Sequence, residues 1–153
     1  MKPLKLLVLI CVAISFSQCK TMKLTETAPF KVTGATYHNW VGGQPGISGT
    51  NLIIGVENDA NITFKKVYFQ NRIVDANLTN RNEKKYVQAN ISTSNRDDST
   101  LVKEGSVKKP KIDPEPIPFN LKLNEAVISY MVGKKTYYYK VSRIKKTDTI
   151  YYP

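Results

Sequence analysis

Hydrophobic and polar residues alternate along much of this chain with a period of two, which is the pattern of a half-buried β-strand. The clearest case is the segment 85–93, where Val87, Ala89 and Ile91 face one way and polar side chains face the other. The segment 52–56 alternates in the same way. Both segments are expected to be strands with one buried face.

Further strands follow on either side of these two. The segment 63–69 is apolar at Phe64, Val67 and Phe69. The step from Phe64 to Val67 is three residues instead of two, and this extra residue predicts a β-bulge. The next strand is expected over 73–78, with Asn71 at the turn between them.

The C-terminal part of the chain predicts an antiparallel hairpin. Two strand-like segments, 126–132 and 136–144, flank Gly133-Lys134-Lys135. A short glycine-containing loop of this kind commonly closes a hairpin. A last short strand over 147–152 is expected after a turn at Lys145-Lys146.

Seven or eight such strands, spaced by about ten residues with almost no helical pattern, predict an all-β domain. A single antiparallel β-sandwich fits this spacing, with an immunoglobulin-like topology among its forms, and a small β-barrel is the alternative. Tyr130 follows Glu125 and Ala126 at a spacing longer than that of the tyrosine corner in immunoglobulin-like sandwiches. It is expected to be a core tyrosine.

Two segments lack a strand pattern. Residues 94–118 contain prolines at 110, 114, 116 and 118, and because proline lacks an amide donor, a long loop is expected there. Residues 41–51 form a second loop, bordered by Trp40 and His38 and containing four glycines: Gly42, Gly43, Gly46 and Gly49. Their spacing matches neither a phosphate-binding loop nor a nucleophile elbow. The loop is therefore interpreted as a structural turn, with a ligand loop as the alternative.

The N-terminus has the features of an export signal. A basic start leads into eleven largely apolar residues, 6–16, which as a helix rise only about 16 Å, too little to cross a bilayer core of roughly 30 Å. Ser15-Phe16-Ser17-Gln18-Cys19 then resembles the lipobox of bacterial lipoproteins, with Gln18 in place of the usual Gly or Ala. Cleavage after Ser17 and plain secretion is the alternative.

The cysteines favour lipidation at Cys19. Cys11 lies inside the signal, so a secreted chain would carry one unpaired thiol in an oxidising compartment. Acylation of Cys19 removes that thiol. The expected organisation is a signal peptide over 1–18, a tether over 19–30 and a domain over 31–153.

Composition limits the chemistry. The 153 residues carry a formal charge of +11, and 41% hydrophobic and 23% charged content are values of one globular domain. Two cysteines and one histidine are too few for a structural zinc site. The clustered acids, at 97, 98, 113 and 115, all lie in the long loop, whereas acid–base catalysis needs carboxylates held at a fixed separation. We expect a protein that is not an enzyme and has no metal or cofactor.

Basic residues gather late in the chain, with no acid between Glu125 and Asp148. Alternation in the hairpin places Tyr138 and Lys140 on its outward face. A candidate binding surface for anionic polymer follows: Lys134, Lys135, Tyr138, Lys140, Lys145 and Lys146. The alternative is that these lysines are merely solvated or lie close to an anionic membrane. Export excludes nucleic acid as the expected partner.

Several short motifs carry a resemblance over about residues 36–145. They are Trp40-Val41-Gly42-Gly43, Gly46-x-Ser48-Gly49-x-Asn51, Val67-Tyr68-Phe69, Pro118-Phe119-Asn120-Leu121, Glu125 to Tyr130, and Gly133-Lys134-Lys135-x-Tyr137-Tyr138. Together they resemble a family of small uncharacterised lipoproteins of Bacteroidota. The resemblance implies export and a lipid anchor, and it implies no activity.

The sequence thus leads to one main functional hypothesis. The chain is expected to be a lipid-anchored protein of the cell envelope, in the outer membrane, whose domain binds or scaffolds another envelope component. The alternative is a polysaccharide- or anion-binding module at the cell surface. Its expected partners are the membrane through the lipid anchor and an envelope protein or anionic glycan.

Overall fold

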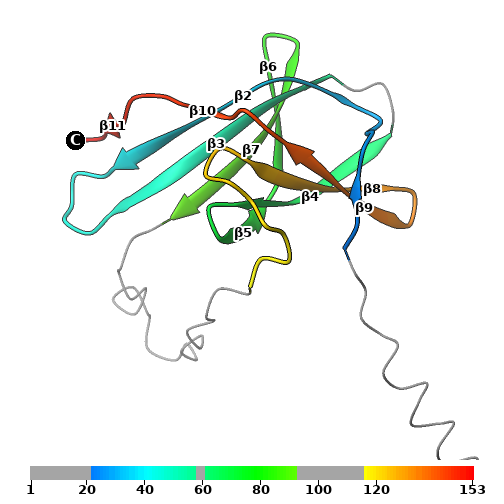
Figure 1. Cartoon of the computed structure of the whole chain (residues 1–153). Helices are drawn as coiled ribbons and strands as arrows, with labels where there is room; N and C mark the ends of the chain where they lie inside the picture. The colour runs from blue at the N-terminus through cyan, green and yellow to red at the C-terminus, as the bar shows by residue number, and fades with distance from the viewer. Residues whose placement is uncertain (1–21, 58–60, 93–115) are drawn as a thin grey trace, which may run out of the picture.

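The computed structural model describes residues 22–57, 61–92 and 116–153, which form a two-layered β structure (Figure 1). Its strands are β1 (Leu24–Thr25), β2 (Lys31–Val41), β3 (Ser48–Glu57), β4 (Ile62–Phe69), β5 (Arg72–Asp75), β6 (Asn77–Arg81), β7 (Lys84–Ser92), β8 (Ala126–Val132), β9 (Lys135–Val141), β10 (Lys145–Lys146) and β11 (Ile150–Tyr151). One sheet has the order β1-β9-β8-β4-β5. The other has the order β10-β2-β3-β7-β6, and β11 also pairs with β2. The predicted all-β sandwich is confirmed, and the sheets do not close into the alternative barrel.

The eight longer strands have an immunoglobulin-like order. β2-β3-β7-β6 corresponds to strands A-B-E-D, and β9-β8-β4-β5 to G-F-C-C′, with every pair antiparallel. Parallel pairs are added at the edges of this antiparallel sandwich: β1 pairs in parallel with β9, and β10 and β11 pair in parallel with β2. Strands of two residues are too short for a hydrophobic pattern to reveal their direction.

The core lies between the sheets and is built from the faces that the alternation predicts. Leu52 and Ile54 of β3 and Val87 of β7 are completely buried, and they meet Val67 and Phe69 of β4. The predicted bulge is present as a register shift between Phe64 and Lys66. Ser129 Oγ holds it, accepting the Lys66 N–H at 2.9 Å and donating to the Lys66 carbonyl at 3.3 Å.

The turns at Asn71 and Gly133 are confirmed, and each residue has a positive φ, of 58° in both cases. The single strand predicted over 73–78 is wrong, because this segment divides between β5 in one sheet and β6 in the other. The break falls at Ala76, whose N–H donates to the Lys65 carbonyl at 2.9 Å. An uninterrupted β pattern does not show where a chain passes from one sheet to the next.

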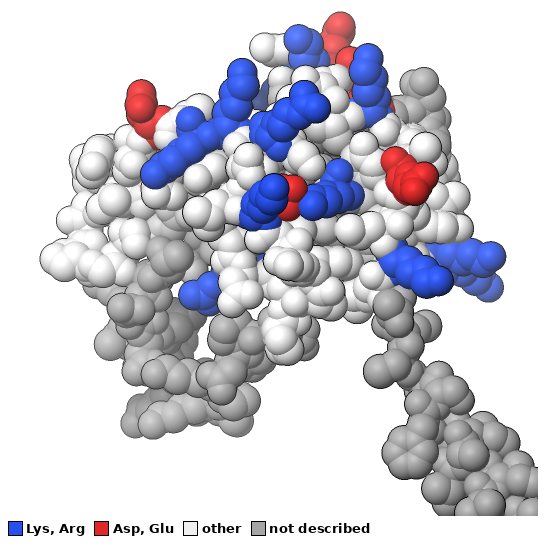
Figure 2. Space-filling view, in the orientation of Figure 1, with Lys and Arg blue, Asp and Glu red and all other residues white. Residues whose placement is uncertain are grey.

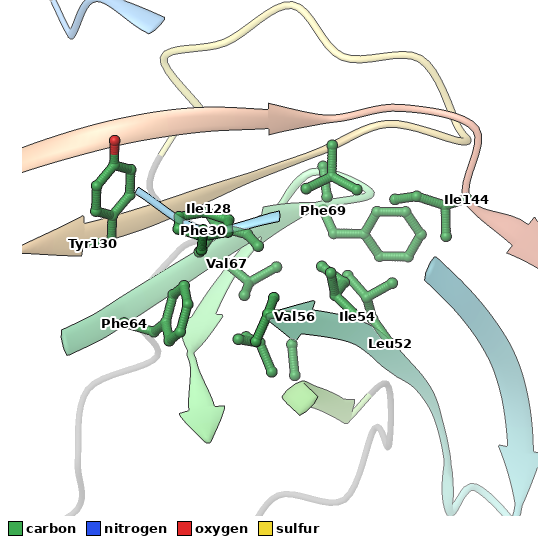
Figure 3. Packing of buried hydrophobic residues seen from close by; sticks show 14 of the residues in the cluster. Phe30, Leu52, Ile54, Val56, Phe64, Val67, Phe69, Ile128, Tyr130 and Ile144 are labelled. Carbon is green, nitrogen blue, oxygen red and sulfur yellow. The ribbon is translucent and has the colours of Figure 1, made fainter. Parts of the chain in front are cut away.

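The segment leading into β2 belongs to the domain. Phe30 is only 8% exposed and makes edge-to-face contacts with Phe64, Tyr130 and Tyr139 at ring-centroid distances of 5.1, 5.2 and 5.4 Å. It lies among core side chains from both sheets (Figure 3). The predicted tether over 19–30 is therefore wrong for residues 22–30. Phe30 is a single aromatic residue at the end of a polar segment, so no hydrophobic periodicity predicts its burial.

The C-terminal segment also crosses from one sheet to the other. Ile144 enters the core at 4% exposure, and the residues predicted as a turn, Lys145 and Lys146, instead pair as β10 with Thr36 and Tyr37. β11 follows alongside the end of β2. Residues 22–30 thus run from the edge of β9 to β2, and residues 142–146 run from β9 to the edge of β2. Phe30 and Ile144 fill the space between the sheets at these crossings.

Tyr130 is a core residue, as predicted, at 2% exposure. It is not a tyrosine corner, because it lies in the middle of β8 and its hydroxyl oxygen is 3.5 Å from Thr25 Oγ1 of β1. The predicted signal peptide, Cys19 and most of the long loop, residues 94–115, lie outside the described residues. Within the described ranges no helix is long and apolar enough to span a membrane.

Candidate functional site

The glycine loop is shaped by close packing with its neighbours. A Cβ on Gly49 would lie 2.6 Å from the Trp40 ring and 2.5 Å from the Ile91 carbonyl oxygen, so glycine leaves room for the ring at this position. Gly46 turns the chain at a φ of +79°. Gly43 leaves room for the backbone of Pro153. These contacts agree with the structural interpretation of the loop.

Beside this loop, at the same end of the sandwich, lies an open hollow of about 530 Å³. Tyr37, Asn39, Gln70 and Tyr151 contribute to its lining, and the Thr50 hydroxyl donates to Asn39 Oδ1 at 3.1 Å. Trp40 stands next to it and meets Tyr152 edge to face at 6.3 Å. His38 is half-buried on β2. No group of three or more possible metal ligands occurs in the part of the chain that the structure describes.

The candidate lysines do not form one surface. Lys134 and Lys135 are exposed at the β8–β9 turn, whereas Lys145 and Lys146 are exposed on β10 at the edge of the other sheet. Lys140 lies on the outer face of β9. Lysine and arginine side chains are accordingly spread over the molecule in several groups (Figure 2).

Lys140 is engaged in an ion pair. Its Nζ lies 2.9 Å from Oε2 of Glu125, whose side chain is only 12% exposed. The same oxygen accepts the Lys122 N–H at 3.0 Å. That backbone hydrogen bond, followed by the bond from Lys140, lowers the pKa of Glu125 below its ordinary value. The hairpin register could have revealed this pair, because it places Lys140 opposite Val127, and Glu125, two residues before Val127, is then a diagonal neighbour of Lys140 on the same face.

Tyr138 also lies on the predicted outward face, but other rings cover it. It packs against Phe119 at 5.5 Å and Tyr68 at 6.2 Å, and these two rings meet edge to face at 5.1 Å. Val127 on the same face of the sheet is completely buried. The sequence pattern missed this cluster because Phe119 comes from a segment with no regular structure.

A different arrangement joins two of the candidate lysines to the N-terminal segment. β1 lies along β9, with Leu24 opposite Tyr138, and the Thr25 hydroxyl donates to the Tyr138 carbonyl at 3.0 Å. Residues 22–25 and 134–138 together line a groove of about 630 Å³, which we call the N-terminal groove. Its lining comprises Met22, Lys23, Leu24, Thr25, Lys134, Lys135, Thr136, Tyr137 and Tyr138. Sequence reasoning missed it because residues 22–25 were assigned to a tether.

Comparison with known proteins adds no relative: no family model, curated protein sequence or solved structure matches this chain.

Proposed function

We propose that this chain is a lipid-anchored protein of the cell envelope, in the outer membrane, and that its sandwich is a non-enzymatic binding or scaffolding domain. The lipid is carried by Cys19, the only cysteine downstream of the apolar signal segment. The observation that supports this most directly is the sequence before Cys19, where a basic start and eleven largely apolar residues lead into the lipobox-like Ser15-Phe16-Ser17-Gln18. Only Lys20 and Thr21 separate Cys19 from Met22, the first residue of the N-terminal groove.

The described polar groups support a binding role over a catalytic one. Glu125 is occupied by Lys122 and Lys140, and the glycine loop is occupied by packing against Trp40 and Pro153. The immunoglobulin-like order does not choose a function by itself, since such folds host many. The hollow beside Trp40 and the N-terminal groove are the described surfaces that a partner could contact.

The alternative is a polysaccharide- or anion-binding module. Lys23, Lys134 and Lys135 around the N-terminal groove, next to Tyr137, support it. Binding of acidic glycans in solution, compared at low and physiological salt, would favour this alternative over scaffolding.

The anchor is tested by replacing Cys19 with Ala and following incorporation of labelled palmitate and partition into detergent. We expect the Cys19→Ala protein to lose the label and leave the detergent phase. Cys11→Ala is the matched control, because it removes the other cysteine of the chain and should leave labelling unchanged. Labelling that survives in Cys19→Ala would contradict the proposal.

A further inference from the structure

The N-terminal groove lies close to the proposed lipid. A residue spans at most about 3.6 Å, so Met22 lies within roughly 11 Å of Cys19. Pairing of Leu24 with Tyr138 then fixes the chain to β9. Because only two residues, Lys20 and Thr21, separate Cys19 from Met22, a lipid on Cys19 would hold this groove near the membrane.

The chemistry of the groove suits an anionic lipid surface. Three lysines and two apolar side chains contribute to its lining: Lys23, Lys134, Lys135, Met22 and Leu24. Met22 and Leu24 are 40% and 42% exposed. Val132, 42% exposed, lines the neighbouring hollow together with the exposed acid Glu26. The three lysines outnumber this acid, so the groove and the neighbouring hollow together carry a net positive charge.

Lysine or arginine side chains gather at the lower right of the domain in Figure 2, the side on which Figure 1 shows the start of the described chain. Attraction between basic residues and anionic headgroups acts within about one Debye length, roughly 8 Å at physiological ionic strength. Because Met22 lies within roughly 11 Å of a lipid-bearing Cys19, the groove lies close to the distance at which headgroups attract its lysines. Lysines also carry apolar stems that can lie along the interface while their ammonium groups reach the headgroups.

We propose that the N-terminal groove docks on an anionic lipid surface and so fixes the orientation of the domain on its membrane. This inference rests on the proposed lipidation of Cys19. The β8–β9 turn lies at the same end of the sandwich as the start of β2. Lys31 of β2 pairs with Glu57 at the end of β3, β4 begins soon after at Ile62, and Ile62 pairs with Val132 beside the turn. The eleven residues of β2 span roughly 33 Å. Docking therefore directs the opposite end, with Trp40 and its hollow, away from the membrane.

The test uses the chain from Cys19 onward, which contains every described residue and a single thiol. Coupling that thiol to a maleimide lipid anchors the protein whether or not cells acylate it. The anchored protein is placed on vesicles of phosphatidylcholine with phosphatidylglycerol, or of phosphatidylcholine alone. Acetylation of each lysine is then followed by mass spectrometry.

We expect slower acetylation of Lys23, Lys134 and Lys135 on the anionic vesicles, reversed at high salt, and no change at Lys145 and Lys146. In Lys134→Gln/Lys135→Gln the docking equilibrium, read from protection of Lys23, should fall roughly thirtyfold, since each basic residue near such a surface contributes about a factor of five. Lys145→Gln/Lys146→Gln is the matched control, with the same change of charge on the other sheet.

Equal acetylation of Lys23 on both vesicles would overturn docking. So would an equal loss of protection in the two double variants, since that would show attraction by net charge alone. Because the anchor here is chemical, neither result depends on whether Cys19 is acylated in cells.

Discussion

Replacing Phe30 with Ala tests whether the N-terminal segment is part of the folded domain. Phe30 is only 8% exposed, and its ring contacts the rings of Phe64, Tyr130 and Tyr139. Phe→Ala in a protein core costs about 3–5 kcal/mol, because apolar contacts are lost and a cavity remains. That is a large share of a total stability of about 5–15 kcal/mol.

Urea unfolding measures this cost, with Trp40 as the only tryptophan of the chain and hence a single fluorescent reporter. Trp40 lies at the other end of β2 from Phe30, so a shifted Trp40 transition reports destabilisation of the whole sandwich. We expect a loss of at least about 3 kcal/mol and a melting temperature lower by roughly 10 °C.

Met22→Ala serves as the control, because Met22 is 40% exposed, and its cost should stay within about 0.5 kcal/mol. Phe30→Leu should lie between the two. If Phe30→Ala is as stable as Met22→Ala, residues 22–30 are a tether and the burial of Phe30 is refuted.

Two further predictions concern other contacts. Gly49→Ala should destabilise the protein by about 1–3 kcal/mol in the same assay, because the new Cβ would meet the Trp40 ring and the Ile91 carbonyl. Gly34→Ala is the control and should not destabilise it, because a Cβ there has nothing within 4 Å. Equal effects of the two substitutions would contradict the packing argument. Glu125→Gln should lower the melting temperature at neutral pH but not at pH values well below the ordinary glutamate pKa of about 4.3. Folding lowers the pKa of Glu125, so its carboxylate stabilises the protein above the ordinary pKa, and this contribution is lost as the carboxyl becomes protonated. A difference that persists unchanged in acid would contradict the role given to the carboxylate.

The sequence predicted those parts of the fold that depend on local alternation. The buried faces of β3 and β7, the bulge near Phe64 and the β8–β9 hairpin all follow from side-chain periodicity and turn chemistry. What it missed depends on contacts between distant segments. Phe30 and Ile144 are buried where the chain crosses from one sheet edge to the other, and Phe119 packs on Tyr68 and Tyr138 from a segment without regular structure.

The candidate site shows the same division. Sequence spacing grouped five lysines that the two sheets then separate, because Lys145 and Lys146 follow the crossing at Ile144. Sequence spacing also did not predict the ion pair of Lys140 with Glu125, which the hairpin register brings close together. Lys23 could be joined to Lys134 and Lys135 only once β1 was known to pair with β9.

The crossings at the two chain ends also bear on self-association. An exposed strand edge offers unpaired N–H and C=O groups to another molecule, and proteins protect such edges by covering, shortening or charging them. Here β1 covers part of β9, while β10 and β11 cover β2, with further bonds from Thr147 and Tyr152 to its carbonyls. The opposite edges, β5 and β6, are short and carry exposed Arg72, Asp75 and Arg81. On the proposed membrane anchor, domains would be held side by side in one plane and would meet edge to edge more often than domains free in solution. The capped and charged edges would then disfavour the joining of neighbouring sandwiches into a continuous sheet.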